Sequence, residues 1–260
     1  MSSQTESKLN RLLKRWPKGT VATLPWLQRV GVSRQLARQY VSSGWLERLG
    51  RGAFVRPGDT VDWLGALYTL QSQLDRSVHA AGLTALSLKG MAHYLQLGPR
   101  KEVLLFGERR GRLPAWFVKH PWGVRLRYHC PNLFASAVPA GFTRLELGDF
   151  AVRISAPERA ILEVLHLATT NEAIEHAVQL MDGLSTLRPR VMQELLEVCR
   201  SIKVKRLFLW MAEHSGHAWF ARLSPGTLNL GVGKRVLYRG GRLDGTYHIT
   251  VPPREALRGV

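Results

Sequence analysis

Long hydrogen-bond donors recur at helical spacing in one short segment near the N-terminus. They are Arg34, Gln35, Arg38, Gln39 and Ser42. Arginine can donate two parallel hydrogen bonds to O6 and N7 of guanine, and glutamine pairs in a similar way with N6 and N7 of adenine. These residue types, one turn apart in two adjacent rows, predict a helix that reads base edges in the major groove of DNA.

The donors lie in the third of three predicted helices. Residues 8–16 place apolar side chains on one face of a helix, and residues 24–30 form a short helix with proline in its first turn. Gly31 makes the next turn, and Ser33 is a natural N-cap for a helix over residues 33–43. Helix, glycine turn and helix is the layout of helix-turn-helix proteins.

A hairpin is predicted directly after the third helix. Residues 45–49 and 53–56 read as strands, and Gly50-Arg51-Gly52 forms the tight turn between them. Such a hairpin is a wing, and arginine at its tip suits contact with phosphate or the minor groove. The predicted DNA-binding residues are therefore Ser33, Arg34, Gln35, Arg38, Gln39, Ser42, Arg48, Arg51 and Arg56.

The distribution of charge supports this interpretation. The 260-residue chain has 37 Lys and Arg against 19 Asp and Glu, a net charge of +18. Residues 1–58 contain eleven Lys and Arg and two Glu, so half of the net charge lies in less than a quarter of the chain. An excess of this size attracts polyanions such as nucleic acid. A three-helix module for protein interaction remains the alternative.

Two further basic segments extend the possible DNA contact. We consider Arg100, Lys101, Arg109, Arg110, Arg112, Lys203, Lys205 and Arg206 as additional phosphate contacts. The alternative for the first five is a solvated sheet edge, where positive charge discourages pairing between sheets.

The remaining pattern predicts an α+β protein with three parts. Residues 1–58 form the winged helix-turn-helix, residues 59–97 a helical linker or extension, and residues 98–260 a C-terminal domain. That domain is expected to combine helices with a small antiparallel sheet, whose strands include residues 103–106, 116–119 and 124–129. Ser155 to Glu158 reads as a capping box that begins a helix, and residues 234–248 as a basic hairpin.

Each candidate pattern for catalysis or metal binding lacks residues that its chemistry requires. The segment 231–234, Gly-Val-Gly-Lys, lacks the first glycine and the following hydroxyl of a phosphate-binding loop. His214 and His217 have no third metal ligand nearby, and Cys130 and Cys199 lie far apart. We expect no cofactor, no metal and no enzymatic activity. No stretch approaches the roughly 18 apolar residues that span a bilayer, so a cytoplasmic protein without membrane contact is expected.

Two motifs resemble one known family. The first is Val-Ser-Arg-Gln-Leu-Ala at 32–37 with Gly-Trp-Leu-Glu-Arg-Leu-Gly-Arg-Gly-Ala-Phe at 44–54, and the second is Ile-Ser-Ala-Pro-Glu-Arg-Ala-Ile-Leu-Glu at 154–163. With this layout, nearly the whole chain resembles the AbiEi-type antitoxins of type IV toxin-antitoxin (abortive infection) systems.

The resemblance implies a repressor that binds inverted repeats of double-stranded DNA in its own promoter. It also implies that the C-terminal domain counteracts a nucleotidyltransferase-like toxin, without a stable complex between the two proteins. Palindromic operators would bring two copies together, so a monomer in solution or a dimer on DNA is expected.

Two other functions remain open at this stage. One is a transcription regulator without a toxin partner, which an adjacent nucleotidyltransferase gene would disfavour. The other is a nucleic-acid enzyme that uses the winged helix for targeting, which metal-dependent cleavage or nucleotide transfer would establish.

Overall fold

The computed structural model describes residues 8–92, 102–108 and 112–253 and divides the chain into two compact units. Unit 1 consists of Met1–His79, Gly98–Cys130 and Arg144–Arg153, and unit 2 of Ala80–Leu97, Pro131–Thr143 and Ile154–Val260. Each unit is therefore assembled from three separate stretches of sequence. This differs from the contiguous division at residues 58 and 97 that the sequence suggested.

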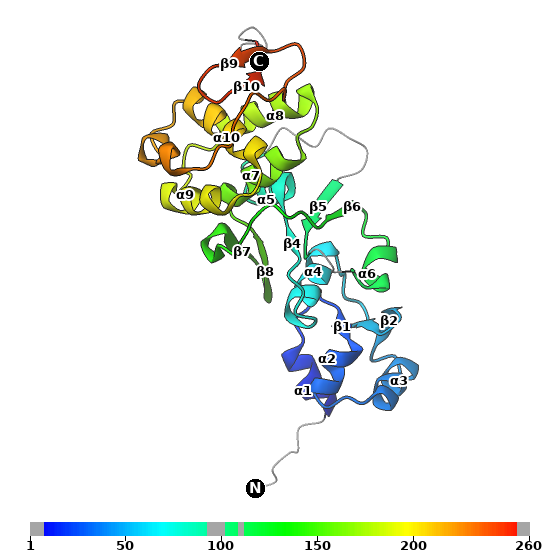
Figure 1. The fold of residues 1–260 in the computed structure, drawn as a ribbon. Coiled ribbons are helices and arrows are strands. Elements are labelled where there is room, and N and C mark those ends of the chain that lie inside the picture. The colour runs from blue at the N-terminus through cyan, green and yellow to red at the C-terminus, as the bar shows by residue number, and fades with distance from the viewer. Residues whose placement is uncertain (1–7, 93–101, 109–111, 254–260) are drawn as a thin grey trace. The chain divides into compact units, whose positions relative to one another are not determined.

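Unit 1 begins with the predicted winged helix-turn-helix (Figure 1). Its helices are α1 (Lys8–Arg15), α2 (Leu24–Arg29) and α3 (Arg34–Ser42), and its strands β1 (Ala22–Thr23), β2 (Glu47–Gly50) and β3 (Ala53–Val55) form one sheet in the order β1-β3-β2. The apolar faces of the helices meet around Leu12, Trp16 and Leu27, which are fully buried. A register shift between Arg48 and Gly50 bends the hairpin near its tip.

Helix α4 (Trp63–Ser72), expected as part of a linker, belongs to the body of unit 1. Thr69 Oγ1 donates to the carbonyl of Val21 at 2.7 Å, and Gln73 Nε2 donates to the same carbonyl at 2.9 Å. A Cβ atom at Gly65 would lie 1.8 Å from the carbonyl oxygen of Gly19, so α4 approaches the module more closely than any side chain would allow. These contacts join α4 to the strand that begins the winged-helix sheet.

The segment after residue 101 corrects two predictions. Residues 116–119 were expected to form a strand, but they lie in helix α6 (Ala115–Lys119), which begins after Pro114. This helix connects β5 (Glu102–Phe106) to β6 (Arg125–His129), and these strands pair in parallel, not antiparallel. Parallel neighbours require a crossover connection, and α6 lies in that connection.

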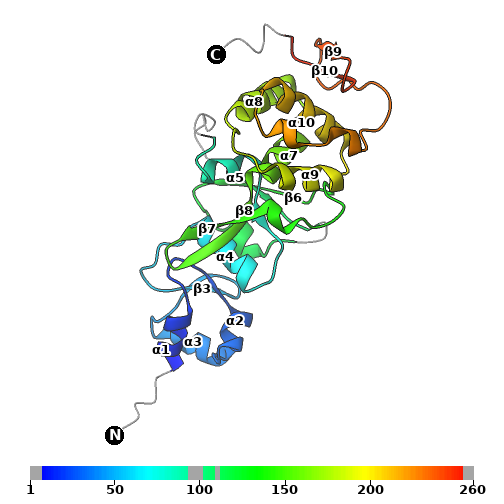
Figure 2. The ribbon, with the colours of Figure 1, turned by 90° about the vertical axis from the view of Figure 1, so that its left-hand side faces the viewer.

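Unit 2 is mainly helical, with α5 (Gly82–Leu88), α7 (Pro157–Leu167), α8 (Asn171–Asp182), α9 (Pro189–Val198) and α10 (Ile202–His214). Figure 2 shows α8, α9 and α10 around α7, which is buried on all sides through residues 160–165. Short 3₁₀ turns at Pro139–Gly141, Phe220–Arg222 and Pro225–Thr227 punctuate the loops. The final hairpin consists of β9 (Arg242–Asp244) and β10 (Ile249–Val251), so its second strand lies beyond the predicted residues 234–248.

The Ser-Ala-Pro-Glu motif holds unit 2 together without forming the predicted capping box. Helix α7 has Ala156 at its N-cap position, with no side-chain cap. Ser155 instead donates to the buried carboxylate of Glu163 at 2.7 Å, and Arg159 Nε donates to the same carboxylate at 2.7 Å. The carboxylate of Glu158 binds Arg188. Both acids are nearly inaccessible to solvent, so the motif supplies internal ion pairs.

A five-stranded sheet has the order β6-β5-β4-β8-β7. Three of its strands contain residues of both units: β4 (His79–Ala80), β7 (Phe142–Leu147) and β8 (Phe150–Ser155). Strand β4 pairs in parallel with β8. The predicted α+β class is confirmed, with a mixed sheet. Among the described residues, no helix has the length and apolar character needed to cross a bilayer.

Candidate nucleic-acid interface

Helix α3 starts where the sequence predicts. Ser33 Oγ accepts a hydrogen bond from the backbone N–H of Leu36 at 3.1 Å, and Ala37 packs into the core of the module. Gly44, with φ +75°, ends the turn after the helix, in a conformation that glycine adopts without strain. These local signals fix which face of α3 is turned outward.

The exposed surface of α3 contains two rows of donors. Arg34 and Arg38, one turn apart, line a groove beside the helix. Gln35, Gln39 and Ser42 form the neighbouring row and are also exposed. The hydroxyl of Ser42 donates to the carbonyl of Gln39 at 2.9 Å.

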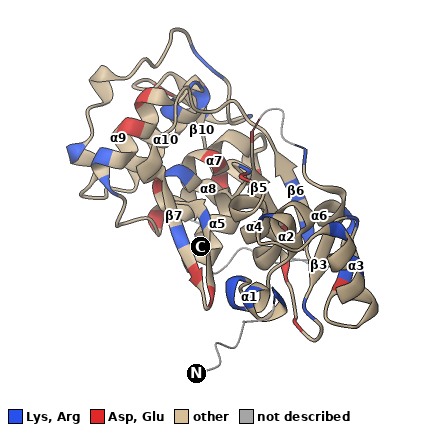
Figure 3. Cartoon of the chain, turned by 90° about the horizontal axis from the view of Figure 1, so that it is seen from below, with Lys and Arg blue, Asp and Glu red and all other residues tan. Residues whose placement is uncertain are grey.

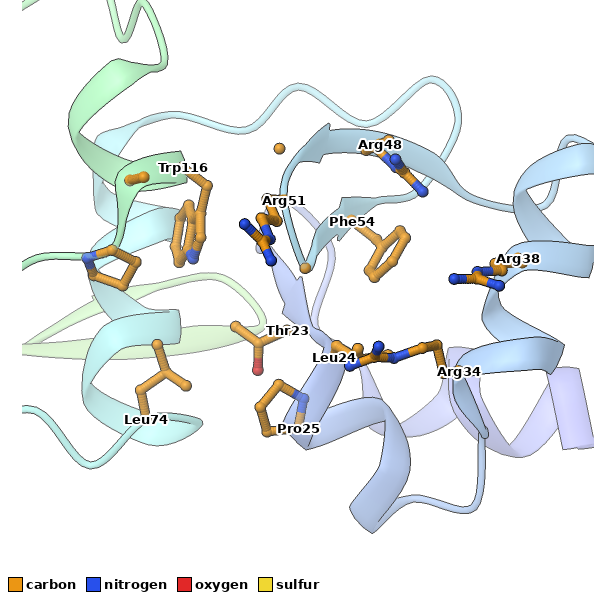
Figure 4. A pocket seen from close by; sticks show the side chains of 14 residues that line it. Thr23, Leu24, Pro25, Arg34, Arg38, Arg48, Arg51, Phe54, Leu74 and Trp116 are labelled. Atoms are coloured by element: carbon orange, nitrogen blue, oxygen red, sulfur yellow. The ribbon is translucent and has the colours of Figure 1, made fainter.

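The groove has a volume of about 1010 Å³ and lies between α3, the hairpin and the start of α6 (Figure 4). Arg34 and Arg38 project into it from α3, and Arg48 and Arg51 from the hairpin. Phe54, Trp116, Leu24 and Pro25 contribute apolar surface, and none of the described residues that line the groove is acidic. All the lining residues belong to unit 1.

The four guanidinium groups of the groove are free to bind an anion. Within the described ranges, none of them forms an ion pair, whereas Arg159, Arg188 and Arg190 each bind a carboxylate. In Figure 3 the Lys and Arg positions recur along α3 and around α6 on the same side of the picture. Positive groups without acidic partners around a concave surface favour a phosphate-bearing ligand.

Arg56 was predicted to contact DNA, but its side chain binds other residues of the module. Its guanidinium donates to the carbonyl of Leu13 at 2.6 Å and lies over the ring of Trp16 at 5.3 Å from the centroid. The side chain thus connects the second strand of the hairpin to α1. Arg56 is therefore not among the proposed DNA contacts.

The structure describes only one of the five predicted phosphate contacts between residues 100 and 112. Arg100, Lys101, Arg109 and Arg110 lie outside the described residues. Arg112 is described, is exposed and belongs to unit 1.

Lys203, Lys205 and Arg206 lie within α10, and their burial and internal hydrogen bonds disagree with the predicted phosphate contacts. Lys205 and Arg206 are almost fully buried, and Lys203 donates to the carbonyls of His166 and Ala168 at the end of α7. Burial lowers the pKa of Lys203 from its ordinary value. Lys205 and Arg206 therefore belong to the interior of unit 2, and the partly buried Lys203 is bound to backbone carbonyls.

Arg206 also binds the segment around residues 231–234, which superficially resembles a phosphate-binding loop. Its guanidinium donates to the carbonyls of Leu230, Gly231 and Gly233 at 2.7, 3.0 and 2.7 Å. A phosphate-binding loop turns its N–H groups toward the ligand, whereas this loop turns carbonyls toward a cation. Elsewhere too, the described residues contain no group of three His, Cys, Asp or Glu that could hold a metal ion.

Sequence analysis missed the contribution of Trp116 to the groove. The residue was placed in a strand, and nothing in its local pattern connects it to a hairpin so far upstream. A close approach to Gly50 makes this connection, and only the three-dimensional structure reveals it.

Comparisons with known proteins agree with this architecture. No curated protein matches the chain. The crystal structure of the RV2827C protein from Mycobacterium tuberculosis matches with a TM-score of 0.55 and 17% identity, over 98% of this chain and 95% of that one. At this identity the likeness shows a shared fold alone.

Two family models together account for nearly the whole chain. The model described as "Transcriptional regulator, AbiEi antitoxin N-terminal domain" matches residues 5–97. The model described as "Transcriptional regulator, AbiEi antitoxin, Type IV TA system" matches residues 100–252. The chain therefore belongs to the AbiEi antitoxin family of type IV toxin-antitoxin systems, a family of transcriptional regulators.

Proposed function

We propose that the protein binds double-stranded DNA through unit 1 and represses the promoter of its own operon. The observation that carries this proposal is the groove between α3 and the hairpin, with four arginines that have no acidic partner. A phosphodiester backbone fits such a groove by its charge, and α3 would then lie in the major groove.

The two rows of α3 take different parts in this complex. Arg34 and Arg38 face the groove, and with Arg48 and Arg51 they bind phosphates. Gln35 and Gln39 are exposed, are not among the residues that line the groove, and read base edges. Ser33, at the N-cap, and Ser42 flank these contacts, and Arg112 extends the phosphate contacts beyond the hairpin.

The operator is an inverted repeat that is occupied by two copies of a protein that is monomeric in solution. Helix-turn-helix proteins place their recognition helices one DNA turn apart, about 34 Å, so the symmetry of the site sets the arrangement of the copies. The protein acts in the cytoplasm, where the promoter is accessible.

Family membership supports a second role as the antitoxin. In this role the protein counteracts a nucleotidyltransferase-like toxin without a stable complex between the two, and has no enzymatic activity of its own. Coexpression of the protein with its cognate nucleotidyltransferase-like toxin should restore growth that the toxin alone arrests. Size-exclusion chromatography of the mixed proteins should show two separate species, and a stable joint peak would contradict the absence of a complex.

A promoter fusion tests autorepression. A reporter driven by the upstream region of the operon should be repressed by the wild-type chain and released by the double substitution Arg34→Ala and Arg38→Ala. Arg190→Ala is the matched control, because it removes an exposed arginine of unit 2 that pairs with Glu194. Equal repression by all three proteins would refute the proposed role of the groove.

A further inference from the structure

The hairpin that supplies Arg48 and Arg51 packs against α6. A Cβ atom built on Gly50 would lie 2.8 Å from Cβ and 3.3 Å from Cα of Trp116. Gly50 has an ordinary φ, so the close approach to Trp116, and not the turn, requires glycine here. Within unit 1, α6 and β2 are thus in direct contact.

Trp116 belongs to a rigid aromatic cluster. Its ring meets Phe117 edge-on at 5.8 Å between centroids, and Phe117 lies 5.8 Å from the ring of Trp122. Trp122 Nε1 donates to the carbonyl of Phe117 at 2.6 Å, which links the ring of Trp122 to the backbone of α6. Because Trp116 is only 7% exposed, its position is set by packing.

The exposed edge of Trp116 faces the groove next to Arg51 (Figure 4). Strand β2 lies at an edge of the sheet β1-β3-β2, so the hairpin tip is held by β3 on one side and by the contact of Gly50 with α6. If the tip were free to move, binding would have to order its backbone as well as both arginines. Packing against α6 removes part of that cost before DNA arrives.

We propose that Trp116 is a positioning residue for DNA recognition, which holds the hairpin so that Arg48 and Arg51 face the groove. This inference rests on the proposed DNA-binding function. It places a determinant of operator affinity within residues 100–252, outside the N-terminal family match.

The test uses the full-length chain and its upstream operator in filter-binding titrations at several salt concentrations. Trp116→Ala should weaken binding about tenfold, because the hairpin arginines must be ordered on binding. It should also make the slope of log K against log salt shallower by about 0.9 for each phosphate that the hairpin no longer neutralises. Trp116→Phe should retain most of the wild-type affinity and most of the wild-type salt slope. Val118→Ala, at a residue of the same helix that is 61% exposed, should behave as wild type.

A double-substitution cycle separates positioning from general loss of structure. In a chain that already carries Arg48→Ala and Arg51→Ala, Trp116→Ala should change affinity less than twofold, because the groups that it positions are gone. A full tenfold loss in that background would overturn the proposal. If instead the wild-type chain does not distinguish the operator from random DNA, the proposed function fails and the positioning role fails with it.

Gly50→Ala covers the case in which Trp116→Ala does not fold. The added methyl group must push the hairpin away from α6 while the aromatic cluster stays intact. We expect the same tenfold loss of affinity, with an unchanged thermal unfolding midpoint of unit 1. Wild-type affinity in this variant would overturn the proposal.

Discussion

The arginines of this chain divide by the partners that they have. Arg206 binds backbone carbonyls and Arg188 binds a buried carboxylate, so these side chains stabilise the fold. Arg38 and Arg51, in contrast, face a groove without a carboxylate. Residue type alone predicts neither role, and the overall charge of +18 therefore overstates the positive surface that is available to DNA.

The two rows of α3 should differ in what they contribute to binding. Arg38→Ala should weaken operator and random DNA alike, with the salt slope shallower by about 0.9. Gln39→Ala should leave binding to random DNA unchanged and lose about 1–3 kcal/mol of discrimination at one base pair. Titrations against the operator and single-base variants measure both effects. An identical loss from the two substitutions would refute the division into rows.

The pair Glu158–Arg188 makes a prediction about pH. Burial raises the pKa of Glu158, but hydrogen bonds from Arg188 and its charge outweigh burial and leave the pKa below its usual value. A carboxyl group whose pKa is lower in the folded state stabilises fully above its unfolded pKa, and this contribution is lost as pH falls through the folded pKa. The pair therefore stabilises unit 2 at neutral pH, and its contribution begins to decline only below about pH 4, the pKa of an unfolded glutamic acid.

Arg188→Ala should accordingly lower the free energy of unfolding at pH 7 by about 2–3 kcal/mol, because Glu158 stays buried with fewer partners. The difference from wild type should shrink on acidification. Urea unfolding at pH 7 and pH 3 measures it, and Arg190→Ala, at an exposed pair, should cost less than about 0.5 kcal/mol. A difference that is constant with pH would contradict the assignment.

At the scale of elements, the sequence predicts those that are encoded by local signals. Helix α3 has its N-cap serine, its buried face and its terminal glycine within a dozen residues, and the hairpin has a glycine turn. Helix α6 has none of these: Pro114 makes no side-chain cap, and the four apolar residues at 115–118 fit a strand equally well. The helix lies in the crossover that the parallel pairing of β5 and β6 requires, and that pairing has no local signal.

The capping residue of α3 allows stability and DNA binding to be separated. Ser33→Ala should lower the free energy of unfolding by about 1 kcal/mol, because the N–H of Leu36 loses its partner. Ser33→Asp should keep that stability, since aspartate caps as well as serine. The added negative charge beside the groove should still weaken DNA binding about fivefold, through repulsion of about 1 kcal/mol. Equal affinity of Ser33→Asp and wild type would place the DNA away from the start of α3.

At the scale of the whole molecule, the composition of the units could not be predicted from sequence. Gln73 binds β1 across some fifty positions, and β5, α6 and β6 join unit 1 although unit 2 residues precede them in the chain. Such long-range contacts have no local signature. Of the predicted DNA-binding residues, Arg34, Arg38, Arg48 and Arg51 line one groove, because they lie within the one compact module that local signals define.

Competition between operator and random DNA tests the central claim most directly. The measurement is a gel-shift titration of the full-length protein on its own upstream region, with excess random duplex at about 150 mM salt, because lower salt inflates non-specific binding. We predict that a discrete complex persists in the presence of the competitor. Complete loss of this complex to the random duplex, in step with its loss to unlabelled operator at the same excess, would show generic adhesion of a basic protein and would contradict operator recognition by α3.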